Sequence, residues 1–133
     1  MRIPAKTADN GTTMALFSKR VKAQQIKSAR DFETALASGK PVFVDFWKPD
    51  CQPCRTMDGI VNELADEFQG EAVILKANLQ YVPDLFGKFK IRSTPTFVLV
   101  TPQDGGLHQR FRHSGLIKKD QLVGQLRKAV EAS

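Results

Sequence analysis

An apolar segment that runs directly into two closely spaced cysteines limits how this chain can fold. The segment from Val42 to Trp47 is apolar apart from Asp45, which is typical of a strand that is covered on both faces and lies centrally in its sheet. Cys51 and Cys54 follow at once, at the start of a stretch with helical periodicity. The sequence therefore predicts a buried strand that delivers two thiols to the first turn of a helix.

The spacing of the two cysteines suits dithiol chemistry. Unpaired backbone N–H groups and the helix dipole favour a thiolate at a helix N-terminus, so Cys51 is the candidate nucleophile. Cys54 lies one helical turn further on, where a second, less accessible sulfur attacks a mixed disulfide, and it is the candidate resolving thiol. The chain has no other cysteine, and a bridge closing so short a loop adds little stability. The pair is therefore predicted to be reactive.

Strand-like and helix-like segments alternate along the rest of the chain. Strands are expected at 21–26, 42–47, 72–77, 96–100 and 107–113, with a hairpin turn at 102–106. Helices are expected at 29–37, capped by Ser28, at 53–68, at 82–89 and over a C-terminal stretch outlined by Leu116, Leu122, Leu126 and Val130. Strands separated by helices, followed by a hairpin, imply an α/β fold with a central mixed sheet and helices on both faces.

Length and charge indicate one domain without a nucleic-acid face. The 133 residues, 41% of them hydrophobic, suit a single domain at 21–133 after a disordered or weakly ordered basic leader at 1–20. The first 28 residues carry +5 of the formal charge of +6, and later basic residues are mixed with acidic ones, so no basic recognition face is expected. The leader is alternatively a vector remnant, a segment ahead of a start at Met14, or an organelle-targeting segment.

Other ligands and compartments are less favoured by the sequence. No stretch approaches the ~20 apolar residues of a membrane span, and a secretory signal is not evident, so a cytoplasmic protein is expected. Two cysteines supply only half of a tetrahedral zinc site, and His108 and His113 are expected on the hairpin, far from them. We therefore expect no metal, no nucleic-acid or membrane partner, and a monomer.

Several separated motifs together resemble the thioredoxin family, from about Val21 to the C-terminus. Asp45 is followed by Phe46-Trp47, and a Cys-x-Pro-Cys pair begins six residues after that aspartate. Thr94-Pro95-Thr96 opens a later strand at the family's distance from the cysteines. The resemblance implies a thioredoxin fold, no bound cofactor, and a protein-disulfide reductase that is restored by an external reductase or dithiol donor.

Asp45 and Pro95 each have a functional and a structural interpretation. A buried carboxylate has a raised pKa and suits a proton acceptor for Cys54; alternatively, a hydrogen bond to backbone or to a lysine satisfies it. The resemblance names Lys76 as that neighbouring lysine. Pro95 is either an ordinary strand start or, as the resemblance implies, a cis-proline that turns the Thr94 backbone toward Cys51 for pairing with a substrate peptide.

The resemblance also assigns supporting and docking positions around the cysteines. Trp47 would pack beneath the active-site loop, and Pro53 favours the first helical turn and a reducing pair. The substrate-binding positions that it implies are Asp50, Gln52, Ser93, Thr94 and Gly115. Asp50 and Gln52 depart from the family pattern, which has tryptophan and glycine there, and the charge of Asp50 should oppose a thiolate at Cys51.

The function predicted from the sequence is therefore the reduction of protein disulfides by dithiol exchange through Cys51 and Cys54. A thiol oxidant or isomerase is the alternative within the same chemistry. A thioredoxin fold that binds a partner through the Pro95 groove without using its cysteines is the alternative from another class.

Overall fold

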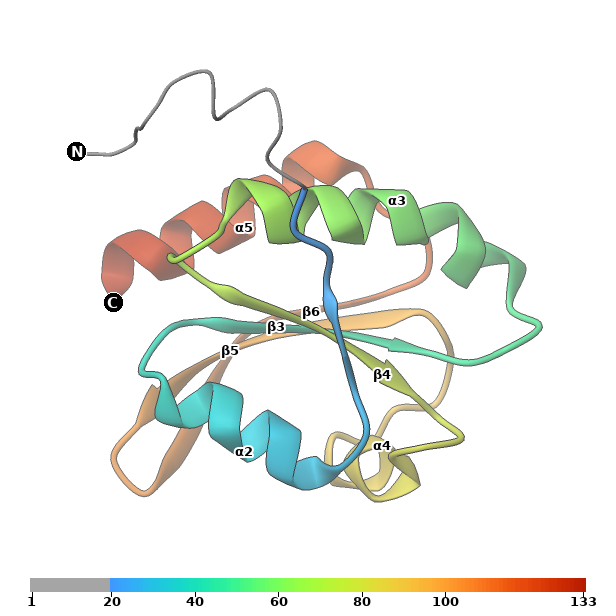
Figure 1. Cartoon of the computed structure of the whole chain (residues 1–133), viewed down its shortest axis with the longest axis horizontal. Coiled ribbons are helices and arrows are strands. Elements are labelled where there is room, and N and C mark those ends of the chain that lie inside the picture. The colour runs from blue at the N-terminus through green and yellow to red at the C-terminus, as the bar shows by residue number, and fades with distance from the viewer. Residues whose placement is uncertain (1–19) are drawn as a thin grey trace.

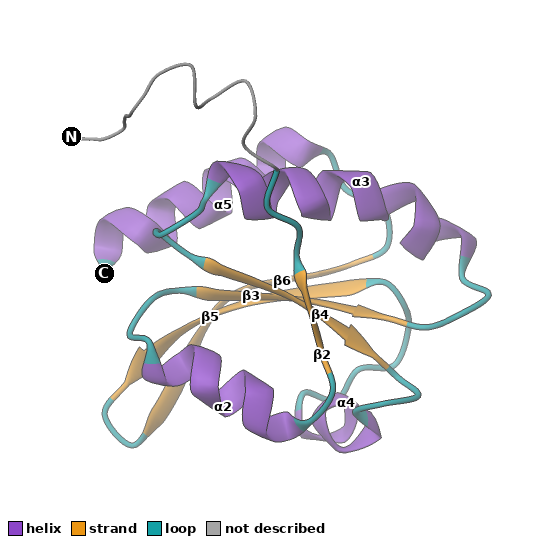
Figure 2. Cartoon of the chain, in the orientation of Figure 1, coloured by secondary structure: helices purple, strands orange, loops and turns teal. Residues whose placement is uncertain are grey.

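A five-stranded mixed sheet runs through the middle of the protein (Figures 1 and 2). The computed structural model describes residues 20–133, and the predicted leader lies outside the described residues except for Arg20. The strands are β2 (Gln24–Ile26), β3 (Val42–Trp47), β4 (Val73–Asn78), β5 (Thr96–Gln103) and β6 (Gly106–Ser114). Their order is β2-β4-β3-β5-β6, with β4 parallel to β2 and β3, and β5 antiparallel to β3 and β6. The apolar strand β3 is central, as its sequence predicts.

Helices cover both faces of this sheet. Helices α2 (Ala29–Ala37) and α4 (Pro83–Lys88) lie on one face, and α3 (Gln52–Glu67) and α5 (Lys119–Ala132) lie on the other (Figure 2). Each face has its own apolar core, and the core under α2 and α4 contains the edge-to-face pair Phe46 and Phe86, with ring centroids 5.0 Å apart. The arrangement confirms the predicted α/β class.

The alternation of side chains along β3 places its one charged residue. Val42, Val44 and Phe46 belong to the core under α2 and α4, whereas Phe43 belongs to the core under α3 and α5. Successive strand residues point to opposite faces, so Asp45 shares the face of Phe43. The carboxyl group therefore lies on the side of the sheet that α3 covers.

Helix α3 begins where the apolar strand has delivered the cysteines. Cys51 is its N-cap residue and Pro53 lies in its first turn, where the missing N–H of proline costs no hydrogen bond. Buried residues recur at helical spacing along its inner side, namely Cys54, Met57, Val61, Leu64 and Ala65. The helix therefore packs its apolar stripe on the sheet and keeps its N-terminus at the end of β3.

Some boundaries differ from those predicted from the pattern. The edge strand β2 begins at Gln24 instead of 21, and the hairpin turn is reduced to Asp104 and Gly105, because both strands continue almost to the turn. The φ of +76° at Gly105 suits a residue without a Cβ atom. The hairpin is therefore longer than its apolar positions alone indicate.

One local prediction holds in position only, and another is wrong. Ser28 is the N-cap residue of α2 but makes no side-chain capping bond; instead, Asp31 in the first turn accepts the Lys27 N–H at 2.9 Å. Leu116 does not belong to the C-terminal helix, which begins at Lys119, and its side chain is 59% exposed. Leu116 lies six residues before Leu122, which is not a helical repeat of three, four or seven, so the spacing separates it from the stripe of Leu122, Leu126 and Val130.

Candidate active site

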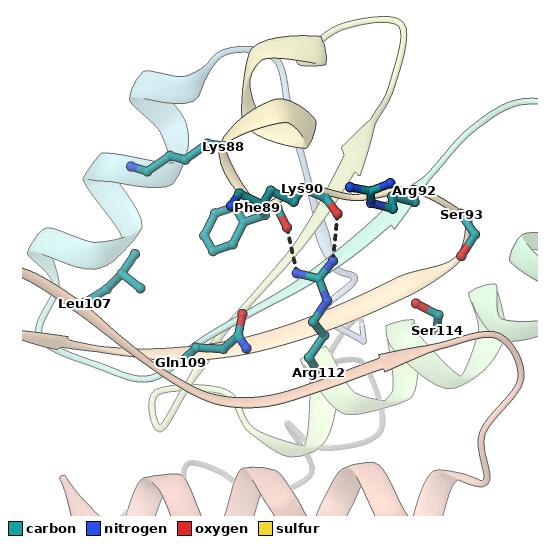
Figure 3. A pocket seen from close by; sticks show the side chains of 9 residues that line it. All are labelled: Lys88, Phe89, Lys90, Arg92, Ser93, Leu107, Gln109, Arg112 and Ser114. Atoms are coloured by element: carbon teal, nitrogen blue, oxygen red, sulfur yellow. Dashed lines mark hydrogen bonds between the residues drawn. The ribbon is translucent and has the colours of Figure 1, made fainter.

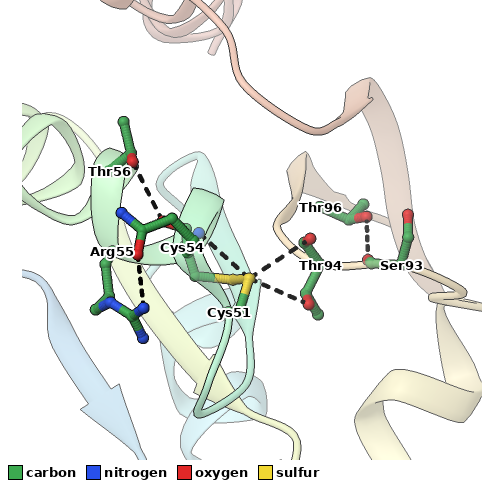
Figure 4. Close-up of a disulfide and its surroundings, with 8 residues drawn as sticks. Cys51, Cys54, Arg55, Thr56, Ser93, Thr94 and Thr96 are labelled. Atoms are coloured by element: carbon green, nitrogen blue, oxygen red, sulfur yellow. Dashed lines mark hydrogen bonds between the residues drawn. A yellow bond between two sulfur atoms is a disulfide. The ribbon is translucent and has the colours of Figure 1, made fainter.

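The two cysteines form a disulfide at the N-terminus of α3 (Figure 4). Their Cα atoms are 5.2 Å apart. The backbone N–H of Cys54 donates to Cys51 Sγ at 3.2 Å, so the first sulfur receives one of the helix's unpaired donors. The same donor would stabilise negative charge on Cys51 Sγ after reduction.

The predicted difference in access between the two sulfurs is not seen in their exposure. Both cysteines are 6% exposed. Their contacts do differ, because Cys51 Sγ lies 3.6 Å from the Thr94 carbonyl oxygen and accepts the Thr94 hydroxyl at 3.5 Å (Figure 4). Cys51 therefore faces the loop before β5, and Cys54 lies on the inner side of α3.

The loop opposite Cys51 is held by neighbouring segments. The Thr94-Pro95 peptide bond is cis. The Gly115 N–H donates to the Pro95 carbonyl at 2.8 Å, and Gly115 adopts φ +94°, a left-handed conformation that favours glycine. The Ser93 carbonyl accepts the Thr96 hydroxyl at 2.7 Å. The structure thus brings the predicted positions Ser93, Thr94, Pro95 and Gly115 together beside the disulfide.

Asp45 is a buried and incompletely paired acid. It is 1% exposed, and its Oδ1 has no hydrogen-bond partner among the described residues. Burial raises the pKa of this carboxyl to about 7; Lys76 opposes the rise and Asp58 adds to it. The interpretation of Asp45 as an acid satisfied by a lysine is therefore wrong for this oxygen.

Lys76 is placed beside Asp45 but forms its ion pair elsewhere. The two residues are opposite each other in the parallel pairing of β3 and β4. The Lys76 ammonium donates to Asp58 on α3, and it also lies 5.0 Å from the centroid of the Trp47 ring. The residues that line an adjacent cavity of about 470 Å³ include Asp45, Asp58, Lys76, Trp47 and Cys54. The buried carboxyl and the second thiol thus border one space.

Asp58 is a site residue that the sequence reasoning missed. Residues four apart lie on the same side of a helix, and Asp58 is four residues after Cys54. It therefore comes directly below the second cysteine on α3, where it meets Lys76. That spacing is the signal that would have identified it.

Sequence similarity to known proteins extends over nearly all of the described chain. The thioredoxin family model matches residues 23–128. The chain belongs to the thioredoxin family. Thioredoxin 1 of Chlorobaculum tepidum is 32% identical over 90 residues, covering 68% of this chain and 85% of that protein. The thioredoxin of Rickettsia conorii is 34% identical over 95 residues, covering 71% and 87% respectively.

Chloroplast proteins are also among the relatives. The M-type chloroplastic thioredoxin of Brassica napus is 35% identical over 98 residues, which cover 74% of this chain and 48% of that protein. The solved structure of chloroplastic thioredoxin z has a TM-score of 0.70 and 25% identity, covering 87% of this chain and 100% of that one. Because the relatives come from both bacteria and chloroplasts, the cytoplasmic location stays a prediction for this thioredoxin-family protein. Family membership and the bonded cysteines support thiol–disulfide oxidoreductase activity.

The residues before and between the cysteines form the exposed surface around this thioredoxin-family site. Asp50 is exposed and adopts φ +60°, a conformation that aspartate tolerates better than most residues. Gln52 is exposed and accepts a hydrogen bond from the Arg55 guanidinium at 2.6 Å. Trp47 is half-buried, and its indole N–H donates to the Gln25 side chain at 3.0 Å. The tryptophan thus contacts the edge strand and the cavity beneath the loop.

The two histidines considered as metal ligands both lie on β6. His108 is exposed on β6, and the His113 Nε2 lies 2.9 Å from the Leu116 carbonyl oxygen. Within residues 20–133, no three or more His, Cys, Asp or Glu side chains are grouped so as to hold a metal ion. No helix in that range has the length and apolar character needed to cross a bilayer.

Proposed function

We propose that this protein reduces disulfides of other proteins, with Cys51 as nucleophile and Cys54 as resolving thiol. The observation that carries the proposal is the placement of Cys51 Sγ between the N-terminus of α3 and the Thr94 loop. In addition, Asp45, whose pKa burial raises to about 7, lines the same cavity as Cys54. Each feature supplies one need of the reaction: a stabilised thiolate, a docking loop and a proton acceptor.

The first step is attack of the Cys51 thiolate on a substrate disulfide. A bond forms between Cys51 Sγ and one substrate sulfur, the substrate S–S bond breaks, and the other substrate sulfur leaves as a thiolate that takes a proton from solvent. Thr94 borders Cys51 Sγ, so an extended substrate segment would pair with its backbone while the sulfurs react. Asp50, Gln52, Ser93 and Gly115 would form the surrounding docking surface.

The second step is resolution by Cys54. Its thiol gives up a proton, attacks Cys51 Sγ, and releases the second substrate sulfur, so that two electrons have passed to the substrate. Asp45 is the proposed proton acceptor, because a base works best when its pKa is close to the working pH. The shared cavity has room for water, through which the proton would travel. An external reductase or dithiol then restores the two thiols.

Trapping of the mixed disulfide tests the assignment of the two thiols. The Cys54→Ser variant, mixed with insulin as a disulfide substrate, is expected to accumulate a covalent complex through Cys51, detectable by mass spectrometry and lost on adding dithiothreitol. The Cys51→Ser variant is expected to lose insulin reduction. If the wild-type protein does not reduce insulin and Cys54→Ser forms no covalent complex, the cysteines are secondary and the protein is a binding module.

The direction of exchange is tested by the reduction potential. A potential near about −270 mV, measured against a glutathione or dithiothreitol series, supports a reductase, whereas one near about −120 mV makes the protein an oxidant. Insulin reduction with dithiothreitol as donor serves as the functional readout beside it.

A further inference from the structure

A second cavity, of about 710 Å³, lies between the segment after α4 and strand β6 (Figure 3). Four basic side chains line it, and no acidic side chain does so among the described residues. We call it the basic groove and define it by Lys88, Lys90, Arg92 and Arg112, with Ser93 and Ser114 at one end. The sequence suggested scattered basic residues without a common face, and the fold gathers these four.

Arg112 is fixed in this groove without losing its charge. Its guanidinium donates to the carbonyl oxygens of Phe89 and Lys90, at 2.6 and 2.9 Å. Carbonyl groups orient a guanidinium but carry no net charge, so the positive charge remains available to a ligand. The same two bonds tie β6 to the segment after α4 and so hold the two walls together.

The other basic side chains are exposed along the wall opposite β6. Lys90 adopts φ +54° in the turn after α4, and Arg92 follows it (Figure 3). Lys88 lies 3.4 Å from Glu33, but both side chains are more than half exposed, and such surface pairs contribute little. The groove therefore keeps a positive potential.

The serine end of the groove borders the candidate active site. Ser93 directly precedes Thr94, which contacts Cys51 Sγ. Ser114 on the opposite wall shares a 2.7 Å hydrogen bond with the Thr96 hydroxyl, one residue after Pro95. A chain segment that leaves the Thr94 loop over Ser93 thus enters the basic groove directly.

We propose that the basic groove binds an acidic segment of the substrate protein that flanks the disulfide being reduced. This inference rests on the reductase function proposed above. In Figure 3 the basic groups of Lys88 and Arg92 lie toward opposite ends of the groove and do not converge on one point. Spaced positive charges match several carboxylates along an extended chain better than one small anion, and such complementarity raises association rates and specificity.

Peptides that share one disulfide but differ in the charge of the adjoining segment test whether the basic groove binds acidic residues. Each carries the same intramolecular disulfide, followed by a tail of Asp and Glu, of Ser and Gly, or of Lys. The wild-type protein is expected to reduce the acidic-tailed peptide with the highest kcat/KM and the Lys-tailed peptide with the lowest. The preference should fade between low and high salt, because the Debye length falls from about 30 Å at 0.01 M to about 3 Å at 1 M.

A variant that lacks two charges of the basic groove tests whether the preference for acidic tails arises there. The double variant Lys88→Gln, Lys90→Gln should reduce the preference for acidic tails, measured as kcat/KM for the acidic-tailed peptide divided by kcat/KM for the Ser-Gly-tailed peptide. We expect this ratio to fall about five-fold at low salt, because two surface charge pairs are lost. Lys40→Gln with Lys128→Gln removes the same charge from exposed positions, one before β3 and one late in α5, and should leave the ratio unchanged. Equal rates for all tails, or equal effects of both variants, would overturn the proposal.

A redox-independent measurement separates this proposal from the reductase function. A cysteine-free acidic peptide, titrated into the wild-type protein, is expected to shift the backbone amide signals of Lys90, Arg92 and Arg112 in NMR spectra. If none of the disulfide peptides is reduced but these amides shift, the reductase function fails and the groove stands. If the peptides are reduced and the amides do not respond, the groove is refuted and the reductase function stands.

Discussion

Replacing Asp45 with asparagine is expected to stabilise the fold above neutral pH and to change its stability little near pH 4. Burial raises the pKa of Asp45 from 3.8 to about 7, with Lys76 opposing and Asp58 reinforcing the rise. Between these values the folded protein holds a proton that the unfolded chain releases, so the free energy of unfolding falls as the pH rises. Below the unfolded value both states are protonated and there is no penalty.

The magnitude follows from the separation of the two pKa values. Each pKa unit corresponds to about 1.4 kcal/mol, so a rise from 3.8 to about 7 makes the full penalty about 4 kcal/mol once the pH exceeds the folded value. Asparagine does not ionise and avoids this penalty. The measured gain should approach 4 kcal/mol from below, since relaxation around a buried carboxylate lowers its cost.

Urea denaturation at a series of pH values is the appropriate assay, because urea does not change the ionic strength. The difference in the free energy of unfolding between variant and wild type should grow from near zero at about pH 4 to its limit at about pH 8. Asp104→Asn is the matched control: Asp104 is exposed in the hairpin turn, where asparagine is equally suited, so its effect should stay within about 0.5 kcal/mol at every pH. A pH-independent difference for Asp45→Asn, or a loss of stability at about pH 8, refutes the reasoning.

Three further measurements test the charges around the cysteines. Asp58→Asn removes the acid that holds the Lys76 ammonium, so the pKa of Asp45 should fall; an unchanged midpoint in an NMR titration of that carboxyl contradicts this. Asp50→Asn removes a negative charge beside Cys51 and should raise the reduction potential by about 5 to 20 mV, as measured against a glutathione series, and a more negative potential argues against it. A general thioredoxin reductase should reduce this protein more slowly than a thioredoxin that has tryptophan where this chain has Asp50. Equal turnover of the two proteins would contradict this prediction.

The central strand and the thiol helix were predictable because local sequence determines them. An apolar run broken only by Asp45 fits a buried strand, and the stripe from Met57 to Phe68 repeats at helical spacing. These two segments fix the position of Cys51 at a helix start. The C-terminal helix was less well bounded: Leu122, Leu126 and Val130 repeat every four residues, whereas Leu116 lies six residues before Leu122, in the preceding loop.

The charges around the site were less predictable, because they depend on pairs that are distant in sequence. The register of β3 and β4 does place Lys76 beside Asp45, as the family resemblance implied. Its partner Asp58 comes from α3, and the pairing depends on how that helix lies across the sheet. The basic groove likewise requires Arg112 on β6 to meet the segment at Lys90, a contact that composition does not reveal.

The pairing of Lys76 with Asp58 explains how the buried acid keeps a useful pKa. An ammonium in direct contact with Asp45 would favour the carboxylate and lower its pKa, leaving a weaker base for the Cys54 proton. Asp58, on α3, pairs with the Lys76 ammonium and also places its own negative charge near Asp45. Both effects favour the protonated form of Asp45 and so raise its pKa. The protein thereby retains an acid that costs about 4 kcal/mol when fully ionised, yet is half-protonated near pH 7, where it both accepts and returns a proton. The stability lost at Asp45 and the proton transfer proposed for it are two consequences of the same burial.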